Sequence, residues 1–118
     1  MIYHLTTRKF WKRALATGDY RIDSLEDEGF IHCSTLAQIL PVAEKFFPHK
    51  NKLVVLLIEN TLLTSILKWE PPSDGAPPVG ALEGELFPHI YGPLNLDAVV
   101  KVLDMERNDE GLFELPGM

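Results

Sequence analysis

The chain has 118 residues, which is the usual length of a single domain. Hydrophobic residues make up 46% of it and charged residues 24%, so its composition is globular rather than disordered, and its longest apolar run (residues 53–58) is too short to span a membrane. The net charge of −6 disfavours nucleic acid as a partner, because nucleic-acid affinity depends on phosphate neutralisation by Lys and Arg.

The first half of the chain is predicted to alternate short strands with helices. Residues 2–6 favour a strand, and residues 7–17 favour a helix that begins at a threonine cap and ends at Gly18. Residues 29–33 favour a second strand, and a second capped helix is expected over 35–47. Four basic residues of the first helix form either its solvated face or a small phosphate-binding patch: Arg8, Lys9, Lys12 and Arg13.

The second half is predicted to consist mainly of strands. The Val/Leu/Ile-rich segment 53–59 is expected to be a central strand covered on both faces. The further predictions, in chain order, are a helical turn over 62–67, a short strand over 68–70, a Pro/Gly-rich loop over 71–80, strands over 86–91 and 98–105, and a tail docked by Phe113 and Leu115. These elements predict a single α+β domain over residues 1–118, with the N-terminal helices packed on the sheet.

Three of the four histidines share a local pattern. His4, His32 and His89 are each followed two residues later by a hydroxyl, and two of them are preceded two residues earlier by a Phe. Since side chains in a strand alternate between faces, each histidine shares its face with these neighbours. The polar and aromatic face is predicted to line a ligand cleft. Its other members are Thr6, Phe30, Ser34, Phe87 and Tyr91.

Other interpretations of these residues stay open. A histidine beside a Phe on a strand is often a structural residue with one hydrogen bond, and three histidines are able to bind zinc, although we expect no metal here. His49 lacks the pattern and is expected at the surface. Cys33 is the single cysteine and is expected to be a small buried residue rather than a nucleophile.

The N-terminal residues carry no basic region followed by a long apolar stretch, as a secretory signal would. With no such signal and one free thiol, the expected location is the cytoplasm.

The chain resembles a known family at three places: residues 2–5, 29–35 and 86–94, the last of which reads Leu-Phe-Pro-His-Ile-Tyr-Gly-Pro-Leu. The family is a small bacterial one, the domain of unknown function numbered 952. It is in turn similar to the ADP-ribosyltransferase-like superfamily. The resemblance implies a split, curved β core around a cleft that binds NAD.

The resemblance also implies roles for individual residues. The first strand resembles a Tyr-His-Gly-Thr motif, which implies that His4 and Thr6 contact the ribose and nicotinamide of NAD, with Leu5 in the place of the glycine. His32 lies near the place of a tyrosine that stacks on nicotinamide. The Glu83-Gly84-Glu85 segment resembles a Glu-x-Glu motif, which implies a catalytic role for Glu85.

The predicted function is binding of NAD or a related nucleotide, with transfer of the ADP-ribosyl group to an acceptor such as a protein, or its hydrolysis. His4, His32, His89 and Glu85 are the predicted catalytic residues. The cofactor would be bound by Thr6, Phe30, Ser34, Phe87 and Tyr91. Two alternatives remain: a non-catalytic module that senses a nucleotide or binds a protein, and acid–base chemistry on another small molecule.

Overall fold

The computed structural model describes residues 1–72 and 84–118. The elements in chain order are β1 (Ile2–Thr6), α1 (Arg8–Thr17), β2 (Asp19–Tyr20), α2 (Ser24–Asp27), β3 (Ile31–His32), α3 (Ile39–Phe46), β4 (Lys52–Ile58), β5 (Ile66–Glu70), β6 (Phe87–Tyr91), β7 (Leu94–Asn95) and β8 (Val99–Glu106). Short 3₁₀ turns cover Leu36–Gln38, Asn60–Leu62 and Leu96–Ala98.

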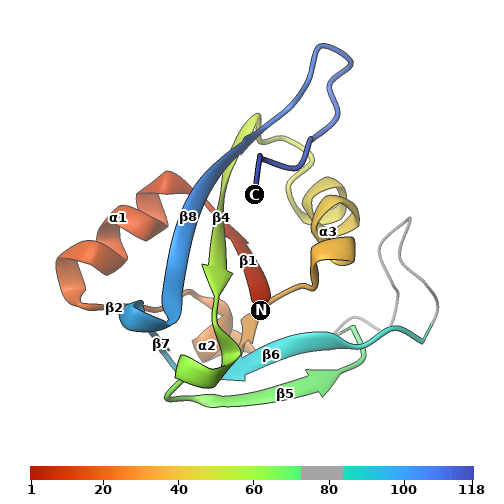
Figure 1. Cartoon of the computed structure of the whole chain (residues 1–118). Coiled ribbons are helices and arrows are strands. Elements are labelled where there is room, and N and C mark those ends of the chain that lie inside the picture. The colour runs from red at the N-terminus through yellow and green to blue at the C-terminus, as the bar shows by residue number, and fades with distance from the viewer. Residues whose placement is uncertain (73–83) are drawn as a thin grey trace.

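Strand β4 is the centre of the fold. It pairs antiparallel with β1 on one side and β8 on the other, and residues 53–58 are all buried. Its two faces belong to different clusters: Val54 and Leu56 pack with Trp11 of α1, and the alternate residues pack with Ile39 of α3. The two helices thus cover opposite faces of this sheet (Figure 1), which confirms the predicted central strand.

A second sheet has the order β3-β6-β5 and is also antiparallel. It runs across one end of the first sheet (Figure 1). The chain passes from one sheet to the other at Cys33 and Ser34. Cys33 N–H donates to the Pro88 carbonyl of β6 (2.9 Å), whereas Ser34 exchanges two backbone hydrogen bonds with Tyr3 of β1 (2.9 and 2.7 Å). The core therefore consists of two sheets joined through this short segment.

Both long helices form where the sequence predicts them. Helix α1 ends at Gly18, whose φ of 99° lies in the left-handed region and whose N–H donates to the Ala14 carbonyl. The second helix begins as a 3₁₀ turn with a capping box between Thr35 and Gln38, and Pro41 lies in the first turn of α3, where its missing N–H costs no helical hydrogen bond.

Some predicted elements are wrong in extent. Strand β3 covers two residues instead of 29–33, because the chain makes one further backbone bond to β6 at Cys33 and then crosses to β1 at Ser34. The helical turn lies at Asn60–Leu62 rather than 62–67, and β5 is longer than the predicted strand 68–70. Strands β2 and β7 pair with each other and were not predicted. Most of the predicted loop 71–80 lies outside the described residues.

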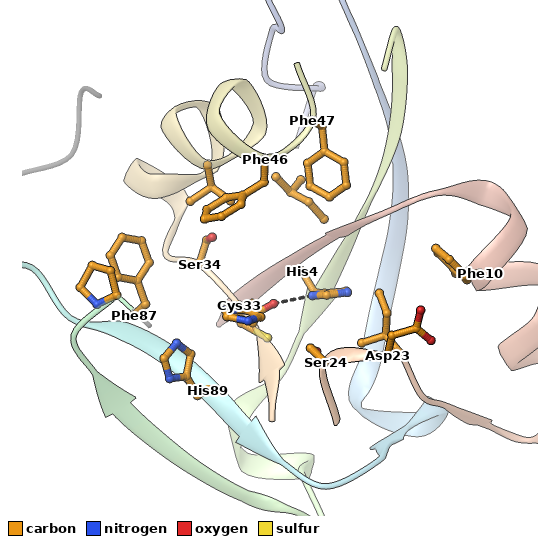
Figure 2. A pocket seen from close by; sticks show the side chains of 15 residues that line it. His4, Phe10, Asp23, Ser24, Cys33, Ser34, Phe46, Phe47, Phe87 and His89 are labelled. Carbon is orange, nitrogen blue, oxygen red and sulfur yellow. Dashed lines mark hydrogen bonds between the residues drawn. The ribbon is translucent and has the colours of Figure 1, made fainter. Parts of the chain in front are cut away.

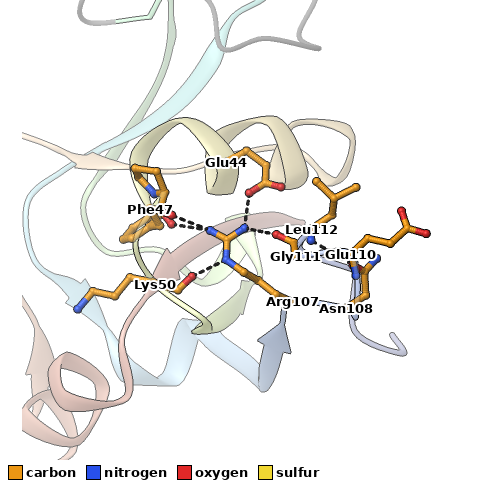
Figure 3. Close-up of polar contacts among 9 residues, drawn as sticks. Glu44, Phe47, Lys50, Arg107, Asn108, Glu110, Gly111 and Leu112 are labelled. Carbon is orange, nitrogen blue, oxygen red and sulfur yellow. Dashed lines mark hydrogen bonds and ion pairs between the residues drawn. The ribbon is translucent and has the colours of Figure 1, made fainter.

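The tail prediction is half right: Phe113 is buried, whereas Leu115 is 43% exposed. Arg107 explains the difference. Its guanidinium carbon lies 3.8 Å from the centre of the Phe113 ring, and its nitrogens donate to groups in the α3 loop and in the turn at Gly111 (Figure 3). The Arg107 contacts hold the Phe113 ring in place, and after the backbone bond from Glu114 N–H to the Glu106 carbonyl the Leu115 side chain is exposed.

The architecture is a compact α+β domain of helices and antiparallel sheets, as predicted, with the N-terminal helices on the larger sheet. The ADP-ribosyltransferase-like detail stays a prediction. No helix in the described residues has the length and apolarity that a membrane crossing needs.

Gly92, between β6 and β7, gives a test of this fold. Its φ is +147°, and a Cβ there would lie 2.6 Å from Ser65 Oγ, which donates to the Pro93 carbonyl (2.7 Å). We expect Gly92→Ala to lower the free energy of unfolding by about 1–3 kcal/mol, from backbone strain and the displaced Ser65 hydroxyl. Gly117→Ala is the control, because nothing lies within 4 Å of a Cβ there. Equal denaturation midpoints for the two variants would contradict this prediction.

Candidate functional site

A cavity of about 370 Å³ opens where the two sheets separate (Figure 2). This volume is within the range of small-molecule sites. Four aromatic rings contribute to its wall, Phe10, Phe46, Phe47 and Phe87, and so do three imidazoles, His4, His32 and His89. Among the described lining residues Asp23 is the one carboxylate, and none is Lys or Arg. The cavity is therefore suited to a flat, largely uncharged group.

His4 is held on both sides of its ring. Its Nδ1 donates to the His32 carbonyl (2.5 Å), and its Nε2 lies 2.7 Å from the Tyr20 hydroxyl. Tyr20 is also hydrogen-bonded to Thr6 Oγ1 (2.8 Å). A carbonyl oxygen can only accept, so the proton of neutral His4 is on Nδ1 and Nε2 accepts from Tyr20. This network ties β1 to β2 and β3.

Burial lowers the pKa of His4 to about 4, with the hydrogen bond to the His32 carbonyl acting in the opposite direction. Burial raises the pKa of Tyr20 as well. At neutral pH both groups are uncharged. Since both His4 nitrogens already have protein partners, its role in this structure is to hold the first strand against the second sheet.

The free edge of β1 faces the cavity at Leu5. The backbone groups of Tyr3 point away from β4 and bond Ser34, and alternation along the strand points the N–H and C=O of Leu5 to the same side. Tyr3 and Ser34 form an antiparallel bridge, and a longer ladder in the same register would place His32 opposite Leu5. His32 instead pairs with His89 in the other sheet. No hydrogen bond reaches these two Leu5 groups in the described part of the chain.

A second polar group centres on His89 of β6. Its Nδ1 donates to Glu70 Oε1 of β5 (2.9 Å), and the Tyr91 hydroxyl donates to the same oxygen (2.6 Å). Phe30 stacks on the imidazole with ring centres 4.1 Å apart. His32 meets it edge-on at 5.4 Å. The orientation of the His89 ring is thus fixed from several directions.

The charge states of this group follow from the same contacts. Burial lowers the pKa of His89, and the hydrogen bond to Glu70 partly offsets this. Hydrogen bonds from Tyr91 and His89 lower the pKa of Glu70, and the bond to Glu70 raises the pKa of Tyr91. At neutral pH the arrangement is a neutral imidazole beside a carboxylate and a protonated phenol.

Five of the predicted site residues line the cavity: His4, His32, Ser34, Phe87 and His89. Four do not. Thr6 is buried and bonds Tyr20, Phe30 packs on His89, Tyr91 bonds Glu70, and Glu85 is half-buried outside the lining. Glu83 lies outside the described residues. The roles assigned to these residues stay predictions.

Three residues that bond the site histidines were not predicted from the sequence: Glu70, Tyr20 and Glu28. Glu70 pairs with Phe87 across β5 and β6, which places it on the His89 face, but the pairing of these strands cannot be known from sequence spacing alone. Tyr20 lies in a segment that carries no periodic pattern. Glu28, which bonds His32 Nε2, was a third omission and comes from the acidic run 26–28.

The described residues contain no group of three His, Cys, Asp or Glu side chains able to hold a metal ion. Cys33 lines the cavity but is buried, and burial raises the pKa of its thiol, so it is protonated at neutral pH. His49 is exposed, as expected.

The chain is similar in sequence and structure to known proteins. A model for a protein of unknown function, DUF952, matches residues 5–102. The crystal structure of protein CC0527 from Caulobacter crescentus is 31% identical, with a TM-score of 0.79 over 96% of this chain and 92% of that one. The solution structure of CC0527 is 32% identical, with a TM-score of 0.73 over 94% and 89%. No curated protein matches. On these similarities in sequence and fold, the chain belongs to the DUF952 family of proteins of unknown function.

Proposed function

We propose that the cavity binds the nicotinamide end of NAD or a related nucleotide, and that the protein transfers or hydrolyses the ADP-ribosyl group. The observation that carries this proposal is the open backbone edge at Leu5 inside an aromatic cavity. A nucleotide that carries a carboxamide on a flat ring is complementary to both features.

The hydrogen-bonding groups match in number and order. In an antiparallel pair, one residue presents its N–H and C=O side by side and exchanges two hydrogen bonds with its partner. A primary carboxamide offers one C=O acceptor and an NH₂ donor on the same edge. Nicotinamide would thus replace the strand residue that β1 lacks opposite Leu5.

The walls support the same ligand. Aromatic side chains such as Phe87 and Phe46 offer faces against which a heteroaromatic ring packs. The lack of Lys and Arg among the described lining residues favours the nicotinamide nucleoside end over the pyrophosphate, which would extend outside the cavity.

A thermal-shift titration with matched dinucleotides tests the proposal. We expect NAD to raise the melting temperature saturably, with a stabilisation of about 2.7 kcal/mol at 100 times its Kd. Nicotinic acid adenine dinucleotide should bind at least 10-fold more weakly, because its carboxylate has no N–H for the Leu5 carbonyl and is repelled by it. ADP-ribose, which lacks the ring, should bind more weakly still.

A pair of buried phenylalanines provides the control. Phe87→Ala removes a cavity wall and should strongly weaken NAD binding, whereas Phe113→Ala removes a buried ring outside the cavity and should lower stability with a much smaller effect on binding. No shift with any of the three ligands at millimolar concentration would refute the proposal. Equal shifts with NAD and its nicotinic acid analogue would refute the role of Leu5, and NAD binding without nicotinamide release would favour the non-catalytic module.

A further inference from the structure

His89 has one ring nitrogen committed to the protein and one directed at the cavity. Nδ1 donates to Glu70, so in the neutral ring Nε2 carries a lone pair. His89 lines the cavity, and its ring rises from β6 toward it (Figure 2). In the described residues no hydrogen bond reaches Nε2, whereas both nitrogens of His4 are engaged. Of these two cavity imidazoles, His89 is the one that can exchange a proton with a ligand.

The surroundings of His89 fix the ring in one orientation. Phe30 stacks on it at 4.1 Å, and the Tyr91 hydroxyl holds Glu70 at 2.6 Å, so that the carboxylate cannot turn away from Nδ1. A carboxylate on Nδ1 sets the tautomer and stabilises the imidazolium that forms when Nε2 takes up a proton. His89 thus combines a fixed ring with a nitrogen that is available to a ligand in the cavity.

We infer that His89 is the general base of the site, with Glu70 as its positioning residue, and that Nε2 takes a proton from an oxygen nucleophile bound in the cavity. This inference rests on the proposed NAD function, because that function supplies the electrophile. It differs from the prediction that Glu85 is the catalytic carboxylate, since Glu85 is not among the residues that line the cavity.

The reaction balances without an added oxidant or reductant. The oxygen of water forms a bond to C1′ of the nicotinamide-bearing ribose as the bond from C1′ to the nicotinamide nitrogen breaks. The bonding electrons stay on that nitrogen, so the positively charged pyridinium leaves as neutral nicotinamide. The proton of water goes to His89 Nε2 and then to solvent, and the second product is ADP-ribose. With an acceptor hydroxyl in place of water, the same steps give transfer.

The test measures nicotinamide release from NAD together with NAD binding on the same protein samples. We expect His89→Gln to lower kcat by about 100-fold or more while NAD still binds, because positioned general bases contribute about 10²–10⁴-fold. A glutamine amide can still donate to Glu70. His49→Gln is the matched control, because His49 is exposed and outside the cavity, and its turnover should equal that of the wild type.

The pH profile of Glu70→Gln tests whether Glu70 acts on the protonation of His89 or only packs against it. Turnover should rise with pH as His89 loses its proton. Because Glu70 raises the pKa of His89, removing the Glu70 charge should move this rise in turnover to lower pH. It should also lower kcat about 10-fold. The other groups that face His89 are unchanged in this variant: Lys68 opposite it on β5, Tyr91 on β6, His32 on β3 and Glu28 after α2. If His89→Gln does not fold, this variant decides alone.

The outcomes distinguish the two levels of the proposal. No NAD binding by the wild type overturns the proposed function and this reaction together. NAD binding without nicotinamide release by the wild type, wild-type turnover in His89→Gln, or a rise in turnover at the wild-type pH in Glu70→Gln overturns the inference and leaves the binding site standing.

Discussion

The wild-type protein is expected to lose about 2–3 kcal/mol of its free energy of unfolding between pH 7 and pH 4.5 through His4 alone, and the His4→Gln variant should lack this loss. The cause is burial, which lowers the pKa of His4 to about 4 in the folded protein. A glutamine does not titrate, and its amide can donate to the His32 carbonyl and accept from Tyr20. Urea denaturation at each pH measures the difference.

The direction follows from proton binding. The unfolded chain binds a proton at His4 with a pKa of about 6.5, whereas the folded protein resists protonation until about pH 4. Between these values the unfolded state holds more protons, so stability rises with pH in this window and is lost as the pH falls through it. Protonation also reverses the hydrogen bond to Tyr20, because both nitrogens then donate and Thr6 Oγ1 is left as the acceptor for the Tyr20 hydroxyl.

A second histidine contributes to the same pH dependence. Burial also lowers the pKa of His89, so part of the slope should persist in His4→Gln. A His4→Gln variant whose stability falls with acidification as steeply as that of the wild type would show that His4 is not buried in its neutral form.

The sequence predicted elements that are long or strongly patterned. Strand β4 was found because an uninterrupted run of Val, Leu and Ile needs cover on both faces, and α1 because a threonine and a glycine mark its ends. The shared face of Phe87, His89 and Tyr91 was found because strand side chains alternate. These features depend on neighbours in sequence.

The parts that could not be predicted depend on contacts between distant segments. Glu70 reaches His89 through the pairing of β5 with β6, and Tyr20 reaches His4 across 16 residues. The open edge at Leu5 exists because β3 leaves β1 for the second sheet, a choice that no local pattern reports. Two-residue strands such as β2 are too short to show any periodicity.

Arg107→Ala is expected to lower the free energy of unfolding by about 3–4 kcal/mol, because it removes a guanidinium that several segments share. The Arg107 side chain is 15% exposed and stacks on Phe113. Its five hydrogen bonds reach the Lys50 carbonyl (2.7 Å), Glu44 Oε1 (2.8 Å), and the carbonyls of Gly111 (2.8 Å), Phe47 (3.0 Å) and Pro48 (3.3 Å) (Figure 3). Without it these acceptors lose their partner, and the tail loses its stacking contact.

Two variants define what the guanidinium contributes. Arg107→Lys keeps the charge beside Glu44 but cannot span the other acceptors, so we expect about half the loss. Arg21→Ala removes an exposed arginine paired with Asp19 and should change stability by less than about 0.5 kcal/mol. Denaturation midpoints for Arg107→Ala and Arg21→Ala that coincide would contradict this stabilising role of Arg107.

Arg107 also connects the tail to the cavity, because it donates to the Phe47 carbonyl and Phe47 lines the cavity. We therefore expect Arg107→Ala to weaken NAD binding as well. A change in stability without any change in binding would show that Arg107 stabilises the tail alone.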